Sequence, residues 1–176
     1  NTIDKAKNIY EDSPEWLEQN MRSTRNFIRK WGHFVKHDQY MKPIVPSKYD
    51  IGLIIKNCNL NLLRELEPWC STVYVDNSRE EYIVSEQPNT IMNLSERVLS
   101  YDNEKQNGVI IEIDRNKFNN DDFRHLQNLS EILDADEQLR EELLHFSDDP
   151  EFELSNMKII VNNLNTIEQE LIICKK

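Results

Sequence analysis

Glycine is scarce in this sequence, with three residues among 176. The tight loops that cradle phosphate groups use several glycines at fixed spacing, and no such loop is present here. The sequence also has no G-x-S-x-G turn and no H-E-x-x-H helix motif. These absences argue against the commonest classes of nucleotide hydrolase, serine hydrolase and zinc peptidase.

Cysteine and long apolar runs are scarce as well. The three cysteines, Cys58, Cys70 and Cys174, form no C-x-x-C pair, which argues against a disulfide framework and against a zinc site. Cys58 and Cys70 flank one short predicted helix and are expected to be buried free thiols, as in a reducing, cytoplasmic compartment. No apolar run is long enough to cross a bilayer, so no membrane span is expected.

Charge, in contrast, is plentiful and unevenly distributed. The net charge of -11 argues against nucleic acid as a partner. From Tyr49 onward, acidic residues outnumber basic ones by roughly two to one. The basic residues before that point are concentrated in one segment, at Arg22, Arg25, Arg29, Lys30, Lys36, Lys42 and Lys48. A basic segment before an acidic body indicates either two functional units or one segment that lies on its own body.

The basic segment contains a predicted helix. Ser13 and Pro14 are typical of a helix start, and Gly32 is expected to end or bend the helix. Apolar side chains recur at steps of three and four residues and define one stripe, while the arginines and Lys30 occupy the other faces. The stripe comprises Leu17, Met21, Thr24, Phe27, Ile28 and Trp31.

The remainder of the chain alternates between strand and helix patterns. Pro43 and Pro46 preclude a regular helix, so 43–48 is predicted to be an extended connector between a basic helical arm (1–42) and an acidic α/β domain (49–176). Helices are expected at 60–69 and from 120 to about 144. Strands are expected at 51–55, 72–75, 82–84, 109–113, 152–154, 157–161 and 171–173. This order predicts an α/β fold with a mostly parallel, Rossmann-like sheet and flanking helices.

One pattern in the body resembles the opening of a family 2 glycosyltransferase. I-I-K-N-C-N at 54–59 is followed by one helix and by V-Y-V-D-N-S at 73–78. In that family a strand ends near an Asn, and a second strand ends in an Asp, commonly within V-D-N-x-S, that contacts the nucleotide of a sugar nucleotide. The resemblance implies such contacts for Asn57 and Asp76.

The same resemblance implies a metal site. The family's metal-binding Asp-x-Asp follows a later strand, where this chain has Glu112-Ile113-Asp114. Residues two apart on a strand point to one face, so Glu112 and Asp114 are predicted to bind Mn or Mg together with the phosphates of a sugar nucleotide. The alternative is that Glu112 is an edge charge and Asp114 a turn residue.

A second stretch resembles the end of the same catalytic domain. N-F-I-R-K-W-G at 26–32 is similar to the amphipathic helix ending in F-x-x-K-W-G that follows the catalytic core in many family 2 glycosyltransferases. This resemblance implies that residues 1–42 are the tail of an upstream catalytic region. The α/β body would then be a separate module joined to that region.

Three functional hypotheses follow. The first is an accessory α/β module of a glycosyltransferase-like protein in glycan or surface-polysaccharide biosynthesis, which binds a sugar nucleotide or a partner protein. The second is an acidic protein-binding protein without enzymatic activity, such as an immunity protein, an antitoxin-like protein or a phage assembly component. The third is a small transferase that acts at Asp76 and the Glu112–Asp114 pair.

Overall fold

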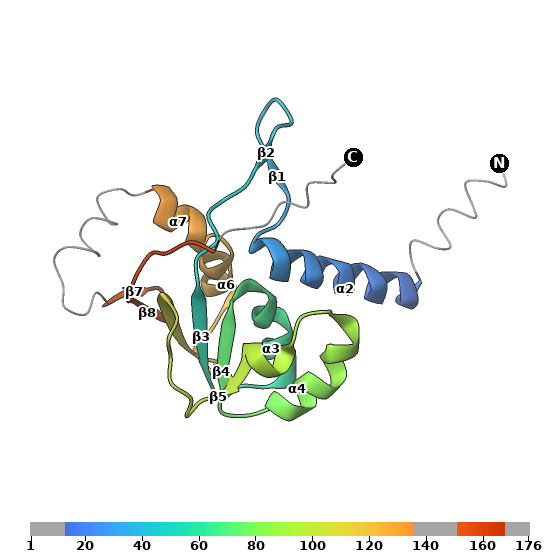
Figure 1. Ribbon diagram of the computed structural model, residues 1–176, viewed down its shortest axis with the longest axis vertical. Helices are drawn as coiled ribbons and strands as arrows, with labels where there is room; N and C mark the ends of the chain where they lie inside the picture. Colours follow the sequence, from blue (N-terminus) through green and yellow to red (C-terminus); the bar gives the residue numbers. More distant parts are fainter. Residues whose placement is uncertain (1–12, 136–150, 168–176) are drawn as a thin grey trace.

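The computed structural model describes residues 13–135 and 151–167 (Figure 1). In this part of the chain a six-stranded sheet has the strand order β5-β4-β3-β6-β8-β7. A separate antiparallel hairpin projects from the body and pairs β1 (Lys36–His37) with β2 (Pro43–Ile44). The predicted domain boundary at 43–48 therefore begins within this hairpin, and the boundary itself stays a prediction.

The sheet is mixed rather than wholly parallel. β3 pairs in parallel with β4 and β6, and β4 pairs in parallel with β5, whereas β8 is antiparallel to both β6 and β7. The predicted α/β class is confirmed, and the predicted mostly parallel sheet holds for its first four strands along the chain. The strand predicted at 171–173 lies outside the described residues. The strands are β3 (Ile51–Lys56), β4 (Thr72–Val75), β5 (Val98–Ser100), β6 (Val109–Asp114), β7 (Glu151–Leu154) and β8 (Met157–Val161).

Local capping groups set the ends of several helices. The Ser13 hydroxyl accepts a hydrogen bond from the Trp16 N–H at the start of α2, and Gly32 ends that helix with φ 79°. Asn119 and Asp122 form a capping box at the start of α6. The helices are α2 (Pro14–Trp31), α3 (Leu60–Leu66), η1 (Glu67–Trp69), α4 (Arg79–Glu86), η2 (Gln87–Asn89), α5 (Leu94–Arg97), α6 (Asn120–Gln127) and α7 (Leu129–Ala135).

Two of these elements differ from the sequence predictions. The strand predicted at 82–84 is wrong, because these residues lie within α4, where Glu80 and Glu81 occupy the first helical turn and Tyr82 is fully buried. The long helix predicted from 120 is interrupted at Asn128, between α6 and α7. Residues 136–150 lie outside the described part of the chain.

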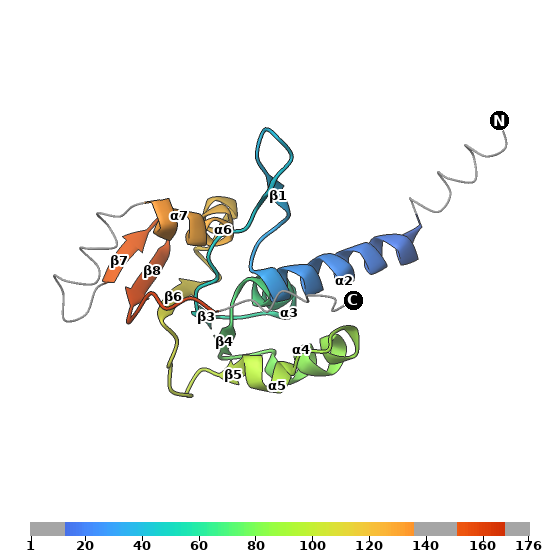
Figure 2. The ribbon, with the colours of Figure 1, turned by 45° about the horizontal axis from the view of Figure 1, so that its top comes forward.

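The two faces of the sheet are covered differently. The main core joins one face to residues from α2, α3, α4, α5, α6 and α7, and Leu53 and Ile111 on that face are fully buried. On the other face, a small cluster around Ile54, Tyr74 and Ile110 includes no helix residue. The loop from β5 to β6 passes over this second face (Figure 2), where Asn107 accepts a hydrogen bond from the Tyr74 hydroxyl at 2.8 Å.

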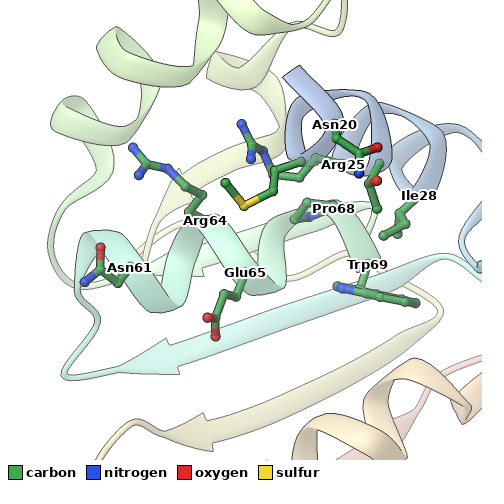
Figure 3. Close-up of a pocket in the computed structure, with 10 residues that line it drawn as sticks. Asn20, Arg25, Ile28, Asn61, Arg64, Glu65, Pro68 and Trp69 are labelled. Atoms are coloured by element: carbon green, nitrogen blue, oxygen red, sulfur yellow. The ribbon is translucent and has the colours of Figure 1, made fainter. Parts of the chain in front are cut away.

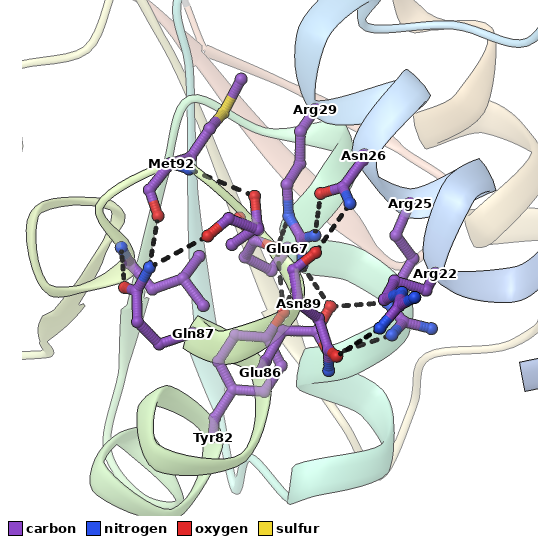
Figure 4. A network of polar contacts seen from close by, with 12 residues as sticks. Arg22, Arg25, Asn26, Arg29, Glu67, Tyr82, Glu86, Gln87, Asn89 and Met92 are labelled. Atoms are coloured by element: carbon purple, nitrogen blue, oxygen red, sulfur yellow. Dashed lines mark hydrogen bonds and ion pairs between the residues drawn. The ribbon is translucent and has the colours of Figure 1, made fainter. Parts of the chain in front are cut away.

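Helix α2 is fixed to the body by a buried ionic network (Figure 4). Arg29, which the sequence places off the apolar stripe, is 1% exposed. Its Nε donates to Glu67 at 2.8 Å, and its Nη2 donates to Glu86 at 2.8 Å and to the Tyr82 hydroxyl at 3.1 Å. Tyr82 in turn donates to Glu67 at 2.9 Å. Helix α2 therefore shares one closed set of hydrogen bonds with η1 and α4.

Each buried carboxylate in this network has a second arginine partner. Arg97 donates to Glu67 at 2.7 Å, and Arg25 forms two bonds to Glu86 at 2.8 and 2.9 Å. Burial alone lowers the pKa of Arg29, but the nearby carboxylates outweigh it and raise the pKa. Burial raises the pKa of Glu86, but the hydrogen bonds from Arg25 and Arg29 outweigh it and hold this pKa below its usual value. Arg29 and Glu86 are therefore charged at neutral pH.

Candidate functional site

The carboxyl ends of the parallel strands define the candidate site. The chain runs from β3 to β4 and β5 on one side and then returns to β6 on the other side of β3. In open α/β sheets, ligands bind outside the carboxyl ends of strands at such a reversal of strand order. Here Asn57 follows β3, Asp76 follows β4 and Asp114 ends β6.

Asn57 links the two aspartates. Its backbone N–H donates to Asp76 Oδ2 at 2.7 Å, and its side-chain amide donates to Asp114 Oδ1 at 3.0 Å. Asn57 has φ 57°, a conformation that Asn tolerates better than most residues. The Cys58 N–H donates to the second oxygen of Asp76 at 3.0 Å. Three of the predicted site residues thus lie together, and both oxygens of Asp76 cap the loop after β3.

The predicted metal pair is less well organised. Glu112 faces Lys56 at 3.5 Å, and Asp114 accepts a second hydrogen bond from the Asn116 N–H at 2.9 Å. That bond and the one from Asn57 lower the pKa of Asp114. Within the described ranges, no three His, Cys, Asp or Glu residues gather to hold a metal ion. Binding of Mn or Mg at Glu112 and Asp114 stays a prediction.

Two clefts lie along this edge of the sheet. One, of about 370 Å³, is lined by Glu112 and Asp114 together with three lysines, which are Lys56, Lys117 and Lys158. The other, of about 360 Å³, lies beyond Asp76 and includes the start of α4. The first cleft carries both signs of charge, so its lysines could contact phosphate oxygens while its carboxylates oppose a second anion.

The sequence reasoning missed a third cavity, between α2 and the α3–η1 segment (Figure 3). Its volume is about 450 Å³, and Met21, Ile28, Pro68 and Trp69 form much of its wall. The available signal was the apolar stripe of α2. Of that stripe only Ile28 is buried, while Leu17 and Met21 are 48% and 57% exposed.

Comparison with protein-family models, with curated proteins and with solved structures finds no match for this chain. In the ranges 13–135 and 151–167, no helix has the length and apolar character needed to span a membrane.

Proposed function

We propose that the chain includes an accessory α/β module of a glycosyltransferase-like protein in glycan or surface-polysaccharide biosynthesis. The observation that carries this proposal is the buried network of α2. The segment 26–32, which resembles the closing helix of family 2 catalytic domains, contributes Arg29 to the bonds with Glu67 and Glu86 of the body. A catalytic region that ended in α2 would thus be held rigidly against the module.

The state of the candidate site supports an accessory role over a catalytic one. Asp76, which the resemblance assigns to the nucleotide, uses both carboxylate oxygens to cap the N–H groups of Asn57 and Cys58. These two bonds, each worth about 1.5–3 kcal/mol because the acceptor is charged, give Asp76 a structural role in the loop after β3. The module therefore contributes contacts to a partner domain and leaves the transfer reaction to that domain.

A Rossmann-like sheet and a cytoplasmic location of the protein belong to the same proposal. The four parallel strands, in the order β5-β4-β3-β6, support a Rossmann-like origin for the sheet. The free thiols of Cys58 and Cys70, both buried, support a reducing, cytoplasmic location.

Titration calorimetry with UDP-glucose and MnCl₂ tests the absence of a catalytic role. The proposal predicts either no saturable heat or weak binding that Asp76→Asn and Asp114→Asn leave unchanged, with or without Mn²⁺. Saturable heat that Asp76→Asn and Asp114→Asn both abolish would instead support the small transferase. The matched control is Asp102→Asn, a carboxylate in the loop after β5 and outside both clefts of this edge.

A protein-binding protein without enzymatic activity is the second candidate function. It is favoured by the β1–β2 hairpin, where Tyr40 and Met41 are 73% and 72% exposed. If this function is correct, a stable complex with a basic partner should form on the acidic body and weaken steeply as salt is raised.

A further inference from the structure

The amino-terminal half of α2 carries an apolar surface that no other described element covers. Trp16, Leu17 and Met21 are 42%, 48% and 57% exposed, and this half of the helix extends beyond the body in both views (Figures 1 and 2). Scattered exposed apolar residues are normal, but Leu17 and Met21 lie one turn apart on one face with Trp16 beside them, and such a group marks an interaction surface. We call these three residues the α2 stripe; this set is distinct from the longer apolar stripe that runs from Leu17 to Trp31.

The α2 stripe continues into the cavity between α2 and α3–η1. Met21 belongs to both, and Ile28, Pro68 and Trp69 carry the apolar lining onward into the body. The cavity of about 450 Å³ has room for one or two large side chains from a partner. The α2 stripe and the apolar cavity are therefore adjacent on the surface of the molecule.

The rim of the cavity carries a cation, the guanidinium of Arg64. Arg64 has no ion pair within the described residues, and its buried Nε lacks a hydrogen-bond partner. In Figure 3 the side chains of Arg64 and Arg25 extend to the same side of the cavity, away from Glu65. Arg64 as a residue is half-buried, so a carboxylate supplied from outside would be stabilised beside the accessible part of its guanidinium.

We propose that the α2 stripe and this cavity form the interface of a homodimer, in which two α2 helices pack antiparallel about a two-fold axis near Met21. Such an axis makes the interface isologous, so each stripe enters the cavity of the other copy. Leu17 of one copy then lies in the hollow between α2 and η1 of the other.

The charges along α2 are complementary under this operation. Glu18 and Arg25 are two helical turns apart and share one flank of the stripe, since seven residues return to nearly the same face. The axis near Met21 exchanges their positions. Glu18 of one copy therefore lies opposite Arg64 of the other copy and opposite Arg25, which also binds Glu86 of its own chain, and the same contact is made twice.

This self-complementarity favours a second copy over other occupants. The exposed residues beside the stripe in the first helical turns are acidic, at Glu15 and Glu18, which opposes an anionic lipid surface. The pairing requires that the upstream catalytic region of the proposed function leaves the α2 stripe free. If it does, the dimer brings two accessory modules together.

Sedimentation equilibrium of the full 176-residue chain tests the proposal. The wild type should fit twice the mass of one chain at about 100 μM, and Met21→Glu should weaken the dimer at least about tenfold, because a charge would be buried on the axis. Ile91→Glu is the matched control, since Ile91 is fully exposed and does not line the cavity. A wild type that remains monomeric, or a dimer that Met21→Glu leaves unchanged, overturns the proposal.

Charge exchange provides an independent measurement. Glu18→Arg and Arg64→Glu should each weaken the dimer, and the double variant should restore most of the loss. Circular dichroism checks that each variant is folded. If the double variant dimerises no better than the single variants, the antiparallel pairing is incorrect.

Discussion

Replacement of Arg29 by methionine tests how α2 is held on the body. Methionine keeps much of the length and volume of the side chain, but it removes the charge and every hydrogen bond to Glu67, Glu86 and Tyr82. We expect Arg29→Met to destabilise the whole fold. The carboxylates of Glu67 and Glu86, whose side chains are 0% and 1% exposed, each lose one cationic partner.

The magnitude follows from the partners that remain. Removing one member of a buried ion pair typically costs about 3–5 kcal/mol. Glu67 retains Arg97, and Glu86 retains the two bonds from Arg25, so neither carboxylate becomes wholly unpaired. We therefore expect the lower end, about 3 kcal/mol, which corresponds to a fall of about 1.5 M in the urea midpoint for a slope of about 2 kcal/mol per molar.

Urea unfolding, followed by tryptophan fluorescence and circular dichroism, measures this loss. Lys30→Met is the matched control at the next position. Lys30 is exposed, and its ammonium lies over the Trp31 ring at 4.9 Å, so its removal should cost less than about 1 kcal/mol. A loss for Arg29→Met no larger than for Lys30→Met would refute the view that the network anchors α2.

Three further predictions concern other parts of the chain. Burial, and then the charge of Arg97, lowers the pKa of Lys48 to about 8 from its ordinary 10.5. Between these values the unfolded chain binds a proton that the folded chain has lost, so the unfolding free energy of the wild type should rise with pH relative to Lys48→Met; a flat difference between pH 7 and pH 10 would show that the shift is absent. Met41 has φ 62° at an exposed hairpin tip, so Met41→Asn should stabilise the fold by about 1 kcal/mol in the same urea assay, and a loss of stability would contradict this reading. Burial raises the pKa of Cys58 to about 12 and also raises the pKa of Cys70. Iodoacetamide at pH 8, followed by peptide mass spectrometry, should therefore label both cysteines slowly in the folded chain and rapidly in urea. Equal rates in the two conditions would show that the thiols are accessible in the folded state.

Much of the central sheet could be predicted because its signals are local. The strands at 51–55 and 109–113 are continuous apolar runs, and the caps at Ser13 and Gly32 mark the two ends of α2. The meeting of Asn57, Asp76 and Asp114 could also be expected, because the carboxyl ends of parallel neighbours share one edge of the sheet.

The remaining features depend on contacts between distant residues. Nothing near Arg29 or Glu67 in the sequence reveals that the two pair at 2.8 Å across 38 positions. The helix at 79–86 contains Ile83 and Val84, whose strand preference is overridden by packing of Tyr82 into the core.

The mixed character of the sheet, in contrast, had a local signal. Only Ser155 and Asn156 separate β7 from β8, and two residues permit an antiparallel hairpin but no parallel crossover.

We propose above that α2 is the last helix of a catalytic region and is held on an accessory module. An immunoblot of the source cells with an antibody against residues 49–176 tests it most directly, together with sequencing of the coding frame before Asn1. The account predicts a protein heavier than 176 residues by a whole catalytic domain, with an Asp-x-Asp motif encoded upstream in the same frame. A band at the mass of this chain, with an initiator codon immediately before Asn1, would contradict it.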